Sequence, residues 1–119
     1  MTYSQICYDV IRAVATITLN RPERLNAWTP TMAAEFRQAM EQANNDPQVR
    51  AIIVTGAGKG FCSGVDMNAL DGMTSSGKTP SKSFTPLDPA AREDFQHPMT
   101  WLPSVGKPII AAVNGAAAG

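Results

Sequence analysis

The sequence of 119 residues has few of the residues that mark disulfide-linked, metal-binding or membrane-spanning proteins. It contains two cysteines and a single histidine. Cys7 and Cys62 lie far apart and form no metal-binding pattern, which favours two reduced thiols over a disulfide. No apolar run is long enough to span a membrane, and no charged leader precedes an apolar core at the N-terminus. These absences predict a cytoplasmic protein with no metal site and no membrane partner.

The sequence also lacks net charge, because ten basic residues balance ten acidic ones. No basic block is present, so the sequence does not favour a nucleic-acid partner. Apolar residues make up 44% of the chain, which argues against overall disorder. A chain of this length is sufficient for one ordinary domain with a modest core.

Two strands are predicted near the N-terminus, at Tyr3–Val10 and Ala13–Leu19. They are expected to pair as an antiparallel hairpin at a sheet edge, although Ile11-Arg12 is a poor tight-turn pair. The second strand alternates between its two faces. One face carries Val14, Thr16 and Thr18, and the other carries Ala15, Ile17 and Leu19.

The segment Asn20–Trp28 is predicted to be a loop because it contains Pro22. A helix is predicted to follow, with Thr29 as its N-cap and Pro30 at its first position. The helical spacing places five apolar residues on one face, where core packing is expected: Met32, Phe36, Ala39, Met40 and Ala43. The helix is predicted to end at Asn44–Pro47.

The residues 51–55, after this helix, are typical of a short buried strand. A strand, a helix and a second strand at this spacing predict a parallel strand pair. The glycine loop Gly56–Gly60 and the stretch Phe61–Met67 come next. Gly64 permits a sharp turn, and Ser63 or Asp66 could cap a short helix through Leu70. Such a junction directs backbone N–H groups at one point, which suits an anion or a developing oxyanion, but it is also common in plain connections.

Residues 71–86 lack periodicity and are predicted to form a loop, followed by a helix at Asp88–Gln96. His97 stands beside a proline in this region and is assigned no role. Ile109–Val113 is predicted to be the last strand, short and apolar as buried parallel strands are. Packing roles are expected for Trp101, Leu102 and Val105.

Three blocks occur in order along the chain: Asn20–Ala27, Phe61–Met67 and Lys107–Gly119. Together they resemble the crotonase (enoyl-CoA hydratase/isomerase) family over nearly the whole chain, except from about Gly72 to Pro98. The resemblance implies an α/β crotonase-like fold with a ββα-type core. Residues 1–119 would form the N-terminal part of a single domain, incomplete at its C-terminus. Residues 71–98 would be a variable region that borders the acyl pocket.

The resemblance implies an enzyme that acts on an acyl-CoA. Enoyl-CoA hydratase is the first expectation, and enoyl-CoA isomerase or another crotonase-family reaction is the alternative. The family stabilises a thioester enolate or a tetrahedral oxyanion with two backbone N–H groups. The first corresponds to the N–H of Val65, where the family usually has Ala, and the second maps one residue beyond Gly119. Coenzyme A is expected as part of the substrate, with no separate cofactor.

The resemblance also implies which residues contact coenzyme A. The positions that match the family's contacts are Arg24, Leu25 and Ala27 in the first block and Ser63, Val65, Asp66 and Met67 in the second. The family often has a second basic residue where Leu25 stands, so a phosphate contact is not expected there. Considered alone, Arg21 and Arg24 fit either solvated surface charges or phosphate contacts.

The two carboxylates of a hydratase map beyond Gly119. One would activate water and the other would protonate the α-carbon, and no acidic residue of this chain stands at either position. We therefore expect a fragment that is inactive alone. The resemblance implies that the whole protein forms a homotrimer or hexamer. The alternatives of another class are a non-catalytic CoA-binding protein and a structural subunit that completes another chain.

Overall fold

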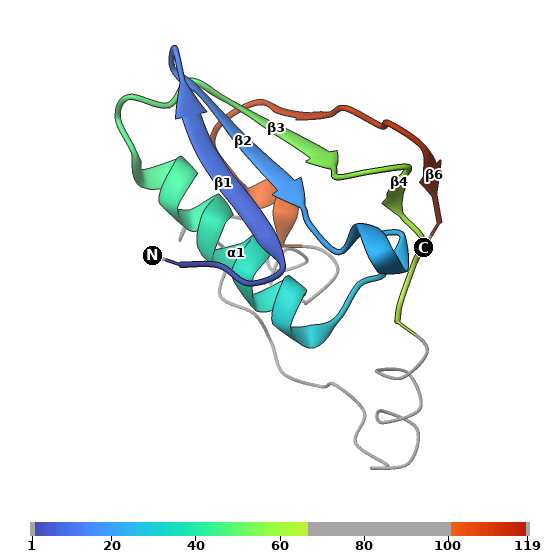
Figure 1. Ribbon diagram of the computed structural model, residues 1–119. Helices are drawn as coiled ribbons and strands as arrows, with labels where there is room; N and C mark the ends of the chain where they lie inside the picture. Colours follow the sequence, from blue (N-terminus) through green and yellow to red (C-terminus); the bar gives the residue numbers. More distant parts are fainter. Residues whose placement is uncertain (1, 67–100, 119) are drawn as a thin grey trace.

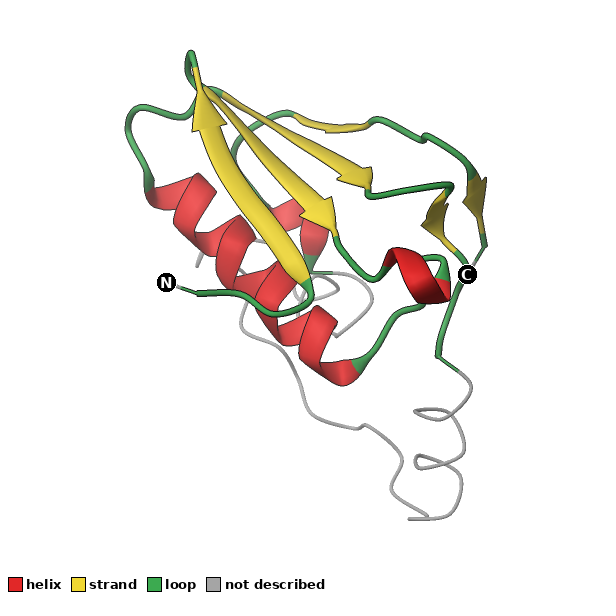
Figure 2. Cartoon of the chain, viewed as in Figure 1, coloured by secondary structure: helices red, strands yellow, loops and turns green. Residues whose placement is uncertain are grey.

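The structure is a computed structural model that describes residues 2–66 and 101–118. Its larger sheet has the strand order β1-β2-β3-β5, and its smaller sheet pairs β4 with β6. Helix α1 lies against one face of the larger sheet, and β4 and β6 lie beyond the end of β3 (Figures 1 and 2). The elements are β1 (Ile6–Ile11), β2 (Val14–Leu19), α1 (Pro30–Asn45), β3 (Ala51–Gly56), β4 (Gly60–Cys62), β5 (Ile109–Ala111) and β6 (Ala116–Ala117), with short 3₁₀ turns η1 (Pro22–Arg24) and η3 (Leu102–Ser104).

The predicted hairpin is confirmed, because β1 and β2 pair antiparallel from Ile6 opposite Leu19 to Ile11 opposite Val14. Its connection is Arg12-Ala13, and both residues have positive φ, 51° and 67°, as in the two-residue turns that suit twisted strands. The predicted start at Tyr3 was wrong. The N–H groups of Ser4 and Gln5 donate to the Glu35 carboxylate of α1 at 2.8 and 2.7 Å, which leads this segment toward the helix.

The predicted helix is also confirmed, including its first turn. The Thr29 hydroxyl accepts a hydrogen bond from the Met32 N–H at 3.0 Å, and Pro30 occupies the first helical position. The five residues predicted to face the core are the five that the helix buries: Met32, Phe36, Ala39, Met40 and Ala43. At the other end, the Lys107 ammonium donates to the carbonyls of Ala43 and Asp46 at 2.7 and 2.6 Å.

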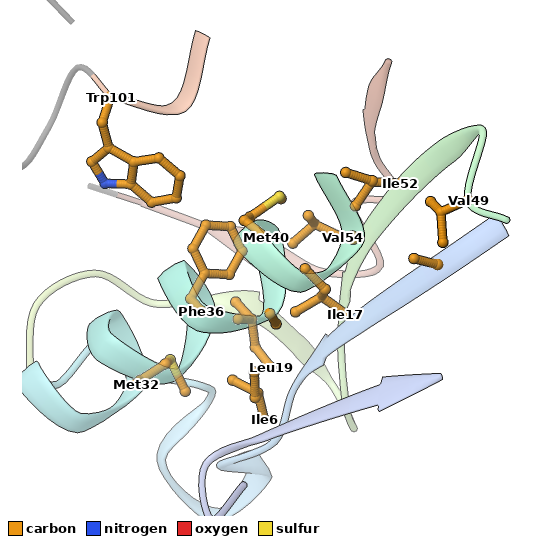
Figure 3. Close-up of a cluster of buried hydrophobic side chains, with 13 residues drawn as sticks. Ile6, Ile17, Leu19, Met32, Phe36, Met40, Val49, Ile52, Val54 and Trp101 are labelled. Atoms are coloured by element: carbon orange, nitrogen blue, oxygen red, sulfur yellow. The ribbon is translucent and has the colours of Figure 1, made fainter. Parts of the chain in front are cut away.

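The core fills the layer between α1 and the larger sheet. Ala15, Ile17 and Leu19 are buried along β2, as the alternation predicted, while the opposite face of that strand is only partly covered. Figure 3 shows Ile17 and Leu19 directed toward Phe36 and Met40. Trp101 extends this core, with its ring centroid 6.1 Å from that of Phe36, and Leu102 and Val105 pack against it as predicted.

Strands β2, β3 and β5 run parallel, as the order of strand, helix and strand predicted. β5 is shorter than the predicted Ile109–Val113, and it is not buried within the described residues. β5 pairs with β3 alone in the described structure, so it is an edge strand, and Ile110 and Val113 are 52% and 58% exposed. The segment 20–28, predicted to be a loop, contains the 3₁₀ turn η1.

Several predictions fall on residues outside the described ranges. These are Met67, the helix through Leu70, the variable region 71–98 with its helix Asp88–Gln96, His97 and Gly119. Within the described ranges, no helix is long and apolar enough to cross a lipid bilayer.

Candidate functional site

The second and third of the three sequence blocks meet through the small sheet, next to the glycine loop. Gly60 pairs with Ala116 and Cys62 with Ala117 in parallel register, and the Ala118 N–H donates to the Cys62 carbonyl at 2.9 Å. Sequence patterns did not predict β4 or β6, because strands of three and two residues rich in Gly and Ala have too little apolar periodicity. The small sheet therefore brings two glycine-rich segments side by side (Figure 1).

Close backbone approach explains the small residues at this place. Gly64 has φ of +106°, and a Cβ atom added to it would lie 3.6 Å from the Ala118 carbonyl oxygen. A Cβ atom at Gly115 would lie only 1.9 Å from the Lys59 carbonyl oxygen. The turn after β5 can therefore pack against the glycine loop only because residue 115 has no side chain.

The backbone of Val65 is held from one side by the segment before α1. The Trp28 N–H donates to the Gly64 carbonyl at 2.7 Å, and the Asp66 N–H donates to the Trp28 carbonyl at 2.8 Å. Trp28 and Val65 thus form a parallel bridge, in which Trp28 bonds to the residues on either side of Val65 and not to Val65 itself. Because successive residues of an extended segment direct their N–H groups to alternating sides, the Val65 N–H points away from Trp28.

The Val65 N–H has no acceptor among residues 2–66 and 101–118. Val65 is also 49% exposed, so this oriented backbone donor belongs to a residue at the surface of this end of the molecule. A fixed donor of this kind can stabilise negative charge on a ligand oxygen.

The two predicted coenzyme A segments come together next to Val65. The Ser63 N–H donates to the Leu25 carbonyl at 3.1 Å, and the Ser63 hydroxyl lies 3.4 Å from the Arg24 carbonyl oxygen. Arg24, Leu25 and Ser63 are all exposed. Leu25 has φ of +51° and ends the η1 turn, so the direction of the chain changes at this point. The structure therefore places three of the predicted residues on one accessible strip.

Two other predicted residues are engaged within the protein. The Ala27 side chain is buried, and its carbonyl accepts a hydrogen bond from Arg21 Nη1 at 2.7 Å. The same Arg21 nitrogen lies 3.3 Å from Asp66 Oδ2, and both side chains are largely buried. Arg21 therefore acts as a crosslink between the loop and the Val65 segment, and the structure does not favour the alternative of a phosphate contact for it.

One residue of this site that sequence reasoning missed is Asn26, which is fully buried and has φ of +56°. Its Oδ1 accepts from the Arg21 N–H at 2.7 Å. Its Nδ2 donates to the Ala57 carbonyl at 3.0 Å and to the Gly60 carbonyl at 2.8 Å. A polar residue between apolar neighbours in a loop was the available signal, because a buried amide needs backbone partners.

A second missed residue is Asn114, in the turn between β5 and β6. Its Oδ1 accepts from the Gly56 N–H at 3.0 Å, and its Nδ2 lies 3.1 Å from the Gly58 carbonyl oxygen. The same nitrogen is 3.3 Å from the Gly60 carbonyl oxygen, which also accepts from Asn26. Both ends of the glycine loop are thus held by asparagine side chains.

The pKa values of Tyr3, Tyr8 and Glu35 depart from their ordinary range, and these residues lie at the β1 and α1 layer. Both Cys7 and Cys62 are free thiols, as predicted. Within the described residues, no group of three or more His, Cys, Asp or Glu side chains could hold a metal ion. The chemistry offered by this part of the chain is backbone hydrogen bonding.

Comparison with known proteins decides the family. The family model described as enoyl-CoA hydratase/isomerase matches residues 10–119. This chain belongs to the enoyl-CoA hydratase/isomerase family. The match confirms the resemblance found in the three sequence blocks.

The names of relatives in the enoyl-CoA hydratase/isomerase family refer to different reactions. A probable enoyl-CoA hydratase of Mycobacterium tuberculosis is 40% identical over 98% of this chain and 42% of its own length. A 1,2-epoxyphenylacetyl-CoA isomerase of Escherichia coli is 39% identical over 96% of this chain and 41% of its own length. The chain therefore spans about two fifths of the length of these curated relatives.

Solved structures of the family agree with the fold. An enoyl-CoA hydratase from Mycobacterium tuberculosis superposes with a TM-score of 0.69 at 31% identity, covering 96% of this chain and 41% of that one. An enoyl-CoA hydratase from Mycobacterium marinum gives 0.69 at 35% identity, with coverage of 94% and 49%. The predicted α/β crotonase-like fold is confirmed for the part of the fold that this chain covers.

Proposed function

We propose that the protein that carries this chain is an enoyl-CoA hydratase and that the Val65 N–H is one donor of its oxyanion hole. The observation that supports this most directly is the geometry of that N–H. It belongs to a half-exposed residue, it points away from the Trp28 segment, and it has no acceptor in the described part of the chain. Family membership supplies the substrate class, since the relatives' names refer to CoA thioesters.

In the proposed reaction, water adds to the β-carbon of the enoyl group and electrons move toward the thioester oxygen. The enolate oxygen then carries negative charge, which a donor fixed beforehand stabilises without reorganisation. Protonation of the α-carbon returns the electrons and completes the addition of water. The carboxylates that the family uses for these proton transfers map beyond Gly119, so the contribution proposed for this chain is to hold the oxyanion.

We also propose that the strip of Arg24, Leu25 and Ser63 follows the coenzyme A moiety of the substrate. These residues are exposed and adjacent, and Ser63 precedes Val65 by two residues on the same backbone segment. The guanidinium of Arg24 suits a phosphate group, whereas Arg21 is held by Asp66 and the Ala27 carbonyl. The bulk of Val65, compared with the usual Ala of the family, would narrow the space beside the thioester.

Isomerisation is the second candidate reaction, and the similarity to the Escherichia coli isomerase favours it. Incubation of the whole protein with crotonyl-CoA separates the two, because hydration increases the product mass by one water, whereas isomerisation keeps the mass and moves the double bond, which NMR of the thioester detects. Tight binding of the thioester without turnover would instead support a non-catalytic CoA-binding protein. Failure to bind it at all would contradict the proposal.

The role of Val65 is tested by a matched pair of substitutions. Val65→Pro removes the backbone N–H, and that N–H makes no hydrogen bond within the described residues. Loss of one such donor is expected to lower kcat by about 100-fold or more. Val65→Ala keeps the N–H and should retain activity. Equal activity of the two variants, at matched thermal stability, would contradict the assignment.

A further inference from the structure

The position of Val65 depends on the position of β4, which precedes it in the chain. The first residue of β4 is Gly60, and its carbonyl accepts hydrogen bonds from two asparagine side chains. The Gly60 carbonyl oxygen accepts from Asn26 at 2.8 Å and from Asn114 at 3.3 Å. Val65 follows only five residues later. A shift of this anchor would therefore be transmitted along a short backbone segment to the Val65 N–H.

Asn26 also fixes the other support of Val65, the segment that ends at Trp28. The Asn26 Oδ1 accepts from the Arg21 backbone N–H, and the Asn26 backbone N–H donates to the Arg21 carbonyl at 2.9 Å. These two hydrogen bonds fix the turn between Arg21 and Asn26. The same turn supplies the backbone groups of Trp28 that bond to Gly64 and Asp66. One buried amide thus sets the glycine loop and the Trp28 segment relative to each other.

Asn114 reaches the same loop from the C-terminal side. It belongs to the turn that leads into β6, whose end lies beside Gly64. Through Asn114, the glycine loop is tied to the second backbone segment of the small sheet. We infer that Asn26 and Asn114 are positioning residues that jointly align the Val65 N–H with the thioester oxygen. This inference rests on the proposed function of Val65.

The alternative is that the two amides only stabilise the fold. The test must therefore measure catalysis and the hydrogen bonding of the bound thioester, and not stability alone. Asn→Asp is the sharpest change at both positions. It keeps an acceptor oxygen for the Arg21 or Gly56 N–H, but it replaces the donor that faces the Gly60 carbonyl. Asn44→Asp is the matched control, because the Asn44 Oδ1 accepts from the Gly106 N–H at 3.0 Å at the far end of α1.

Two readouts are measured on the whole protein. The first is kcat and KM with crotonyl-CoA. The second is the infrared stretch of bound butyryl-CoA, a saturated analogue, isotopically labelled at the thioester carbonyl carbon. Hydrogen bonds from an oxyanion hole lower this frequency relative to the thioester in water, and a merely structural residue does not change it in the folded protein.

We expect Asn26→Asp to lower kcat by about 100-fold and Asn114→Asp by roughly tenfold, because small displacements of an oriented group are costly. KM should stay within about threefold, since the substitutions leave the residues of the proposed coenzyme A strip in place. Both variants should lose part of the carbonyl shift, and Asn44→Asp should match the wild type in both readouts.

Other results would overturn the inference. If the wild-type carbonyl is shifted and both variants keep that shift and their kcat, the two asparagines do not position Val65. A rise in KM with unchanged kcat would assign them to coenzyme A binding instead. If Asn26→Asp does not fold, the exposed Asn114→Asp decides by the same criteria. If the wild-type carbonyl shows no shift, the proposed function itself fails.

Discussion

The helix-covered sheet (α1 with β1, β2 and β3) and the site end (the segments 20–28, 56–66 and 114–118) are held together by different interactions. In the helix-covered sheet, interdigitated apolar side chains such as Ile17, Leu19 and Met40 fill the space between the layers. At the site end, backbone hydrogen bonds and two asparagine amides connect the segments, and the exposed residues include Val65. Stability and the placement of the donor are therefore largely separable properties of this chain.

The largest expected effect on stability comes from opening the helix-covered sheet. Met40 is fully buried between α1 and the sheet, so Met40→Ala should lower the free energy of unfolding of the whole protein by about 2–5 kcal/mol. Chemical denaturation measures this change. Gln38→Ala, at an exposed position of the same helix, should stay within about 0.5 kcal/mol of the wild type.

If the two regions are separable, folded Met40→Ala protein should keep the wild-type kcat and the wild-type carbonyl frequency of bound butyryl-CoA. A large loss of kcat in the folded variant would show that core packing determines the geometry of the site. Stability and the placement of the donor would then not be separable.

Gly115→Ala is expected to have a smaller effect on the free energy of unfolding than Met40→Ala, but to change the site end directly. The new methyl group would lie 1.9 Å from the Lys59 carbonyl oxygen, so the turn and the glycine loop must move apart. We expect kcat to fall by about 100-fold, or about 2.7 kcal/mol, because a displacement of the backbone by about 1 Å misplaces the oriented donor. Gly106→Ala is the control, because its Cβ would meet only the Asn44 side chain at 3.6 Å. Wild-type kcat in Gly115→Ala would contradict the importance of this close approach.

The smallest effect is expected from Glu35, which ties the residues before β1 to α1. Burial, the largest single influence, raises the pKa of this carboxyl, but hydrogen bonds from Ser4, Gln5 and Ile6 together lower it below its ordinary value. A lowered pKa in the folded state stabilises the protein above the ordinary glutamate pKa, about 4.3. That contribution is lost as the pH falls through the lower pKa of the folded state.

Glu35→Gln should therefore be less stable than the wild type at neutral pH, by less than about 1 kcal/mol because the group is near the surface. The difference should shrink as the pH falls through the lowered pKa of the Glu35 carboxyl in the folded protein, where the wild-type carboxyl becomes protonated. Thermal unfolding of both proteins over a pH series measures this. A difference that is constant with pH would rule out the proposed charge dependence.

The helix-covered sheet could be predicted from the sequence because apolar periodicity encodes it. The alternation of Ala15, Ile17 and Leu19 and the cap at Thr29 each fix a local structure that the folded chain keeps. The boundary at Ile6 could not be predicted, because it depends on the contact of Ser4 and Gln5 with the distant Glu35.

The site end was predictable only in part. Glycine spacing indicated the turn at Gly64, and the resemblance to the family indicated Val65. The strands β4 and β6 and the roles of Asn26 and Asn114 follow from contacts between segments more than 30 residues apart in the chain. Such contacts have no local periodicity, since small residues and single amides make them.

The measurement that tests the central claim most directly is the structure of the whole protein with bound butyryl-CoA. We predict that the thioester oxygen lies within about 2.7–3.1 Å of the Val65 nitrogen, with the N–H directed at it. A thioester oxygen held by other groups, with Val65 beyond hydrogen-bonding distance, would contradict the assignment of the oxyanion hole and the inference built on it.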